Sequence, residues 1–346
     1  MRKFLSRIFL LFSVSLLLQS PSRCRAEAPG EASVYGELKP LAGWSRYSGD
    51  SARSVKGWWR WWWYLLLKEA TVITWMDGLK LKVYPRNEIY RSISVRGIYN
   101  PNFIVAIKTL LAQKEGGVFI DVGADMGHFS LLSASAVGSR GRIHAIEPSS
   151  RDFGRLKENV SINDLQSVIR IHRLAISDRS GPTKLSVACE ERSALNTLGD
   201  EFSFKGVEKV TVEDVEAVTI DEFVEKEGVD RLDVLKLDVE GSETRALTGA
   251  LKTLERFRPA IMLGVNAVAL KSCGSSLEEL LSLVRRLKYR IYMLAESPTF
   301  GLEEISDVAG AHVKVVFCLH EGATPPTLPQ PENLSVGEIL RDFFLR

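Results

Sequence analysis

The chain has 346 residues, of which 45% are hydrophobic and 25% are charged, and its formal net charge at pH 7 is +2. This length has room for one large α/β domain with appendages or for two domains, and the composition is that of an ordinary globular protein. Acidic and basic residues are mixed along the chain, so we expect no nucleic-acid partner.

Residues 1–28 are predicted to lie outside the fold. Arg2, Lys3 and Arg7 precede a mostly apolar run over residues 8–18, and a small-residue cleavage pattern ends at Ala28. This pattern is typical of a signal peptide, and an uncleaved anchor over residues 4–18 or an organellar transit peptide are the alternatives.

Residues 29–70 are predicted to be a linker followed by a tryptophan-rich segment. Five of the seven tryptophans lie within residues 58–63. The stretch from Trp58 to Leu67 suits a membrane interface and equally a helix packed on the next domain. We therefore predict membrane association through residues 4–18 and this stretch, with packing as the alternative.

Residues 71–115 are expected to form a cap on the main domain. Short strands are predicted over residues 72–75 and 79–84, joined by a turn. An irregular connection over residues 91–102 and a helix over residues 103–111 follow.

A glycine loop between a strand and a helix is the first stretch that indicates chemistry. Residues 118–122 read as a strand, and residues 128–137 read as a helix. This geometry aims backbone N–H groups and the helix dipole at a bound anionic group. The residues assigned to the cofactor site here are Asp121, Gly123, Ala124, Asp125, Met126 and Gly127.

The spacing of this loop separates two nucleotide chemistries. A dinucleotide fold requires G-x-G-x-x-G, but Asp125 and His128 stand where its second and third glycines would be. Asp121 would repel a pyrophosphate but suits an ammonium group, such as the methionyl end of S-adenosylmethionine. Glu147, followed by Pro148, ends the next predicted strand and suits the two ribose hydroxyls. The alternative is a glycine-rich turn that binds nothing.

The remaining chain alternates strands and helices, which is typical of a parallel sheet covered on both faces. We expect the main domain over residues 116–322 and a tail with a terminal helix over residues 323–346. The predicted strands cover residues 142–147, 168–176, 184–188, 210–220, 233–239, 260–265, 289–295 and 313–319. The predicted helices cover residues 151–162, 221–227, 242–257 and 277–287.

Charged residues interrupt the predicted strand over residues 233–239. Side chains alternate along a strand, so Lys236, Asp238 and Glu240 would share one face. Because ligands bind at the carboxyl ends of parallel strands, this face is expected to border the substrate. The alternative is a structural network of a lysine and carboxylates.

Four motifs in this order resemble the FkbM-type methyltransferase family, a branch of the class I S-adenosylmethionine-dependent enzymes. They are IDVGADMG (120–127), AIEP (145–148), AISD (175–178) and LKLDVEG (235–241). The resemblance implies a Rossmann-like, mostly parallel seven-stranded sheet with an antiparallel last strand. It also implies S-adenosylmethionine as cofactor, with contacts from Asp121, the glycine loop and Glu147, and with adenine near Ser177 and Asp178.

The family mostly methylates hydroxyl oxygens, so a base is expected at the acceptor. Asp238 or Glu240 could take the hydroxyl proton, and Lys236 more plausibly orients a carboxylate. His128 is interpreted as a contact at the helix terminus. Many members carry a glutamate in the fifth core strand where this chain has Gly264, and Asn266 is a candidate replacement. No cluster has the spacing of a metal site, and none is predicted.

Hydroxyls of small molecules, sugars and lipids all remain open as acceptors. One alternative is a non-catalytic, membrane-anchored protein with the same fold, and a less favoured one is a nicotinamide-dependent oxidoreductase. S-adenosylmethionine is made in the cytosol, so we expect a membrane-associated protein whose catalytic domain faces the cytosol. Organelle targeting, or export after cleavage near Ala28, is the alternative location.

Overall fold

The computed structural model describes residues 69–329, except residues 85, 114, 201, 204–205, 296–300 and 307–313. The predicted N-terminal segment, the tryptophan-rich stretch and the predicted terminal helix lie outside the described residues. Within the described range, no helix is both long enough and apolar enough to cross a membrane.

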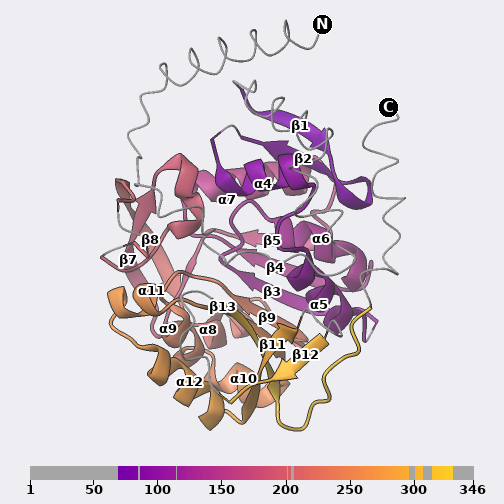
Figure 1. Cartoon of the computed structure of the whole chain (residues 1–346), viewed down its shortest axis with the longest axis vertical. Helices are drawn as coiled ribbons and strands as arrows, with labels where there is room; N and C mark the ends of the chain where they lie inside the picture. The colour runs from indigo at the N-terminus through magenta and orange to yellow at the C-terminus, as the bar shows by residue number, and fades with distance from the viewer. Residues whose placement is uncertain are drawn as a thin grey trace, which may run out of the picture.

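A twisted eight-stranded sheet forms the centre of the molecule (Figure 1). Five consecutive strands, from β10 to the edge strand β5, are mutually parallel, and β13 is antiparallel to both of its neighbours. The predicted mostly parallel sheet with an antiparallel last strand is therefore confirmed, with β12 added at one edge. Across the sheet the strands are β12 (Gly301–Glu304), β11 (Tyr289–Ala295), β13 (Lys314–His320), β10 (Ala260–Val265), β9 (Val234–Leu237), β3 (Val118–Val122), β4 (Arg142–Ile146) and β5 (Ile169–His172).

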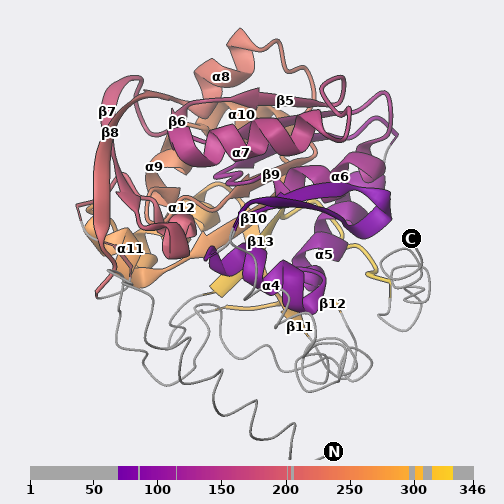
Figure 2. The same cartoon turned by 90° about the horizontal axis from the view of Figure 1, so that it is seen from above.

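Helices cover both faces of the sheet, which gives three layers (Figure 2). Each face has its own apolar core, because strands buried on both sides carry apolar side chains in both directions. One core is completed by α4 (Glu88–Arg96), α5 (Pro101–Ala112), α6 (His128–Val137) and α7 (Ser150–Ser161). The other is completed by α8 (Ile220–Lys226), α9 (Glu243–Thr248), α10 (Leu251–Phe257), α11 (Ala267–Ser272) and α12 (Leu277–Arg286).

A second, three-stranded sheet stands beside the central one. Its order is β6 (Ala175–Ile176), β8 (Lys209–Val218) and β7 (Gly181–Ala188). The single strand predicted over residues 168–176 is therefore wrong. The chain leaves β5 after His172 and re-forms as β6, which pairs with β8 and not with the central sheet.

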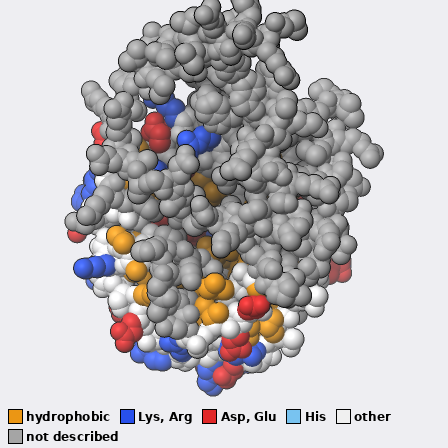
Figure 3. Space-filling model, viewed as in Figure 1, with side chains coloured by type: hydrophobic (Ala, Val, Ile, Leu, Met, Phe, Trp, Pro, Cys, Tyr) orange, Lys and Arg blue, Asp and Glu red, His pale blue; other side chains and the backbone are white. Residues whose placement is uncertain are grey.

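The cap contains a hairpin of β1 (Thr71–Thr74) and β2 (Lys80–Val83), joined by the short 3-10 turn η1 (Met76–Gly78). The predicted irregular connection over residues 91–102 is largely wrong, because α4 occupies its first half. Asn87 caps this helix by accepting hydrogen bonds from the N–H groups of Ile89 and Tyr90. On the face of the molecule in Figure 3, basic and acidic side chains of the described residues are intermixed.

Candidate active site

A pocket opens at the carboxyl ends of β3, β4 and β9, and its empty space, including the part open to solvent, is about 820 Å³. This is the edge of a parallel sheet at which ligands are expected. The walls come from the glycine loop, from the ends of these strands and from the segment after β7. The predicted site residues in its lining are Gly123, Ala124, Asp125, Glu147, Pro148, Lys236 and Asp238.

Several backbone N–H groups of the glycine loop donate hydrogen bonds to backbone carbonyls of the chain, which we did not predict. The N–H groups of Gly123 and Ala124 both donate to Ile146 O at 3.0 Å, and that of Gly127 donates to Ala124 O. These three N–H groups are therefore bound by carbonyls of the chain, and anion binding by the loop and the start of the next helix stays a prediction. Gly123 has φ +74°, and a Cβ there would lie 2.0 Å from Asp238 O, so only glycine fits.

Glu147 holds the loop in place with both carboxylate oxygens. Its Oε2 accepts from the N–H of Asp125 at 2.9 Å, and its Oε1 accepts from the N–H of Ser149. Burial, and next the Asp152 carboxylate, raises the pKa of both Asp125 and Glu147 above the usual range of carboxyl groups. Asp125 Oδ2 is buried and has no hydrogen-bond partner among the described residues.

A buried ion pair lies beneath the pocket. Lys236 Nζ is 3.0 Å from Asp121 Oδ1 and also donates to Gly123 O at 2.9 Å. Burial lowers the pKa of Lys236, but the nearby carboxylates of Asp121 and Asp238 outweigh it, and the pKa is raised. Asp121 Oδ2 accepts from Ser130 Oγ at 2.7 Å. Asp121 is thus fully buried and does not line the pocket, and its contact with a methionyl ammonium stays a prediction.

Asp238 follows β9 directly and lines the pocket. Its N–H donates to Val122 O at 3.3 Å. Gly264 lies against its side chain, because a Cβ at Gly264 would be 2.7 Å from Asp238 Oδ1. The absence of a side chain at Gly264 therefore leaves room for the Asp238 carboxylate. Asn266, the predicted replacement for a missing glutamate, instead caps α11 through the N–H groups of Val268 and Ala269.

Glu240 does not share a face with Lys236 and Asp238. The strand ends at Leu237, and Glu240 lies in a turn with φ +44°. Its buried carboxylate is outside the pocket lining and accepts from Ser203 Oγ at 2.5 Å. Burial, and next the Asp238 carboxylate, raises the pKa of Glu240 to about 8. The predicted alternation of side chains between the two faces of the strand is therefore wrong for Glu240, which lies beyond the end of β9.

Three further predicted residues lie near the pocket without lining it. Met126 is fully buried below the loop, and its carbonyl accepts from Asn159 Nδ2. Ser177 Oγ donates to Asp178 Oδ1, and the pocket wall is made by the preceding Ala175 and Ile176.

His128 lines the pocket at the start of α6. Its Nε2 is buried without a hydrogen-bond partner among the described residues. Burial, and next Lys236, lowers the pKa of His128 to about 3, so the ring is neutral at physiological pH. The Nε2 atom of this neutral imidazole is therefore a candidate contact for a ligand in the pocket.

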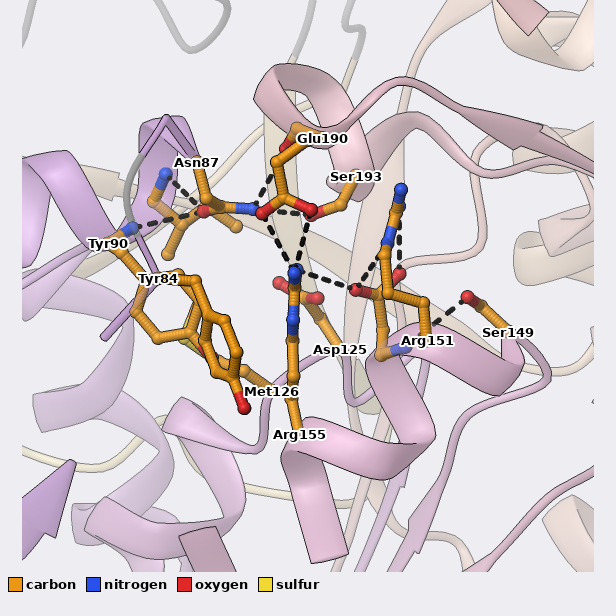
Figure 4. Close-up of polar contacts among 12 residues, drawn as sticks. Tyr84, Asn87, Tyr90, Asp125, Met126, Ser149, Arg151, Arg155, Glu190 and Ser193 are labelled. Atoms are coloured by element: carbon orange, nitrogen blue, oxygen red, sulfur yellow. Dashed lines mark hydrogen bonds and ion pairs between the residues drawn. The ribbon is translucent and has the colours of Figure 1, made fainter. Parts of the chain in front are cut away.

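A polar network that the sequence did not indicate ties the far pocket wall to α7 (Figure 4). Arg155 binds both carboxylate oxygens of Glu190, at 2.7 and 2.9 Å, and Oδ1 of Asp152 at 3.2 Å. Asn87 Nδ2 donates to Ser193 Oγ at 2.7 Å. Glu190 and Ser193 belong to the 3-10 segment η2 (Glu190–Leu195), so this network sets where Ser193 stands in the pocket wall.

Glu243 was also missed, and it fixes the turn that carries Asp238. Its two carboxylate oxygens accept from the N–H groups of Val239 and Gly241, at 3.1 and 3.0 Å. The available signal was a carboxylate two residues after Gly241, at the start of a helix, where acidic side chains satisfy free N–H groups.

Gly264→Ala is expected to lower kcat by roughly 10- to 100-fold while leaving donor binding intact. The added methyl displaces the Asp238 carboxylate, and a shift of about 1 Å costs that much in a positioned reaction. Steady-state kinetics of the variant measure the effect. Gly154→Ala is the matched control, because a Cβ at Gly154 meets nothing within 4 Å. Equal activity of wild type and Gly264→Ala would contradict the placement of Asp238.

The sheet order and the pocket at its carboxyl edge are those of the class I methyltransferase fold. Residues 121–291 match the family model of the methyltransferase FkbM domain. Residues 121–291 therefore carry a methyltransferase FkbM domain, as the sequence motifs predicted.

The chain is also similar to several known proteins. The chain is 25% identical over 220 residues to the 31-O-demethyl-FK506 methyltransferase FkbM of Streptomyces tacrolimicus, covering 57% of this chain and 81% of that protein. It is 29% identical over 180 residues to the hexuronic acid methyltransferase AglP of Haloferax volcanii, covering 49% and 62%. Among solved structures, an S-adenosylmethionine-dependent O-methyltransferase from Thermotoga maritima is similar at 16% identity and a TM-score of 0.38, covering 74% and 79%.

Proposed function

We propose that this protein transfers the methyl group of S-adenosylmethionine to a hydroxyl oxygen of a small molecule, sugar or lipid. The observation that carries the proposal is that the glycine loop, Glu147 and Asp238 reach one pocket within an FkbM domain. Two relatives named for O-demethyl-FK506 and hexuronic acid as methyl acceptors support a small-molecule or sugar acceptor.

The residues present suit this donor. Asp125 Oδ2 and His128 Nε2 are buried polar atoms of pocket-lining residues that have no hydrogen-bond partner in the described part of the chain, and a ligand with polar groups would satisfy them. Glu147 is the proposed acceptor for the ribose hydroxyls, in addition to the two N–H groups that it binds, and Pro148, Ala175 and Ile176 are the proposed apolar wall for a base. Asp121 is the proposed partner of the ammonium group, which has to reach it behind the pocket lining, where its carboxylate is bound by Lys236 and Ser130.

Asp238 is the proposed general base. The donor supplies a methyl group already activated on a sulfonium, so the protein has to align an oxygen and remove its proton. Alignment can lower the barrier by roughly 7–11 kcal/mol. Asp238 lines the pocket and can accept the proton of the acceptor hydroxyl. Lys236 is held by Asp121 and the loop carbonyls, so it keeps the loop and Asp238 in position and does not take the proton.

Titration calorimetry of the full chain with S-adenosylmethionine and its demethylated product tests the donor assignment. Binding of both is expected, and absence of heat with both would leave only an α/β scaffold. An acceptor screen with labelled S-adenosylmethionine then tests catalysis. Donor binding without methyl transfer to any acceptor would favour the non-catalytic alternative, and thermal protection by NAD in place of the donor would favour the oxidoreductase.

A further inference from the structure

Two histidines and a glutamate from three separate elements meet on the sheet face that α8 covers. His144 is in the middle of β4, His172 ends β5, and Glu227 is the C-cap residue of α8. His144 Nδ1 lies 3.2 Å from His172 Nε2, and His172 Nδ1 lies 3.9 Å from Glu227 Oε1. One potential ligand atom from each residue lies within 4.8 Å of the other two. None of the three lines the methyltransferase pocket.

The spacing of the two imidazole nitrogens fits a shared metal ion. Zinc–nitrogen bonds are about 2.0–2.1 Å long, which places two ligands of a tetrahedral ion about 3.3–3.4 Å apart. The observed 3.2 Å is close to this separation. The Glu227 carboxylate lies beside Nδ1, the other nitrogen of His172, so it must approach the ion from there, and its side chain is 22% exposed.

The 3.2 Å contact between His144 Nδ1 and His172 Nε2 is a hydrogen bond, so one of these two nitrogens carries a proton in the metal-free chain. A neutral imidazole carries its proton on either of its two nitrogens, so this proton has to move to the other nitrogen of its ring, or to solvent, when an ion binds. Metal ions bind the unprotonated nitrogen of a neutral imidazole. The edge of the Phe223 ring contacts both imidazoles, with centroids 5.5 and 4.8 Å away, and covers this side of the pair.

Basic neighbours oppose a cation at this place and limit its affinity. Arg170 Nη1 lies 3.7 Å from Glu227 Oε2, and its side chain is 47% exposed. The positive charges of Arg142 and Lys226 also act on the histidines. An ion would displace Arg170 toward solvent and take its place beside the Glu227 carboxylate, so entry is expected from this exposed side.

We propose that His144, His172 and Glu227 bind one divalent transition-metal ion, best matched by zinc, which ties α8 to strands β4 and β5. Two imidazoles and one carboxylate are a ligand set that zinc accepts, with water as the fourth ligand. An ion bound only by the folded chain stabilises it. The three ligands are far apart in the sequence, so no spacing motif predicts the site. The proposal does not depend on methyl transfer.

The test is thermal unfolding of the full chain, first treated with a chelator and then titrated with zinc chloride. At a zinc concentration about a hundred times Kd, Tm is expected to rise by roughly 5–10 °C. Calorimetry should show one zinc ion bound per chain. His172→Gln and Glu227→Gln are each expected to lose the zinc-dependent rise, whatever their own Tm without metal.

His320→Gln is the matched control, since His320 on β13 lies outside this cluster, and it should keep the full rise. His172 and Glu227 are partly exposed, so their variants are expected to fold. The proposal is overturned if zinc does not shift Tm of the wild type, or if both ligand variants keep the full rise. If only the Glu227→Gln variant keeps the zinc-dependent rise in Tm, Glu227 is not a ligand and the three-residue site is wrong.

Discussion

Asp121→Asn is expected to destabilise the protein by about 3–5 kcal/mol and to abolish donor binding. The substitution leaves Lys236 buried without its ion-pair partner, and breaking a fully buried pair from one side costs that much. The Lys236 side chain is 2% exposed and that of Asp121 is 0% exposed, so water cannot solvate the remaining charge. Urea unfolding measures the loss of stability, and calorimetry with S-adenosylmethionine measures the loss of binding.

The exposed pair of Lys184 and Asp214 provides the control for this prediction. Its nitrogen–oxygen distance is 2.9 Å, but the side chains are 73% and 84% exposed. Asp214→Asn should therefore leave the unfolding midpoint unchanged. An Asp121→Asn variant as stable as the wild type would contradict the buried ion pair. A variant that still binds the donor normally would contradict the proposed contact of Asp121 with the ammonium group.

The central sheet could be predicted because its strands and helices have strong local signals. The observed bounds of β3, α6 and β10 match the predicted residues, since short apolar runs end at glycines or asparagine. The predicted helix over residues 242–257 is instead two helices, α9 and α10, separated at Gly249 and Ala250. Gly249 packs where a Cβ would lie 2.3 Å from Ser177 O, a contact that local sequence cannot reveal.

Part of the candidate active site could also be predicted from local sequence signals. The motifs placed Glu147 and Asp238 at one edge of the sheet, because parallel strands end together. The alternation rule failed at Glu240, because it assumes a continuing strand. Gly241, at φ +106°, packs against Ala269 O and turns the chain there. The network of Arg155 with Glu190 joins α7 to η2, and the sequence separation of these residues hides their contact.

Asp238→Asn is expected to lower kcat by about 10²- to 10⁴-fold while the affinity for S-adenosylmethionine stays unchanged. Asparagine keeps the shape that Gly264 accommodates but cannot accept the proton of the acceptor hydroxyl, and a general base contributes that factor. Single-turnover rates with the donor prebound separate the chemical step from binding. Asp230→Asn, an exposed position, is the matched control and should behave as the wild type.

Glu240→Gln separates the two carboxylates that the sequence offered as bases. Glu240 lies outside the pocket lining and is held by Ser203, so we expect a much smaller loss of turnover from its substitution. A large loss in Glu240→Gln together with a small loss in Asp238→Asn would reverse the assignment. Similar small losses in both variants would indicate that the acceptor loses its proton to solvent or to His128, whose neutral ring also lines the pocket. The ratio of the two losses therefore identifies the base, because the two carboxylates follow the same strand but only Asp238 faces the pocket.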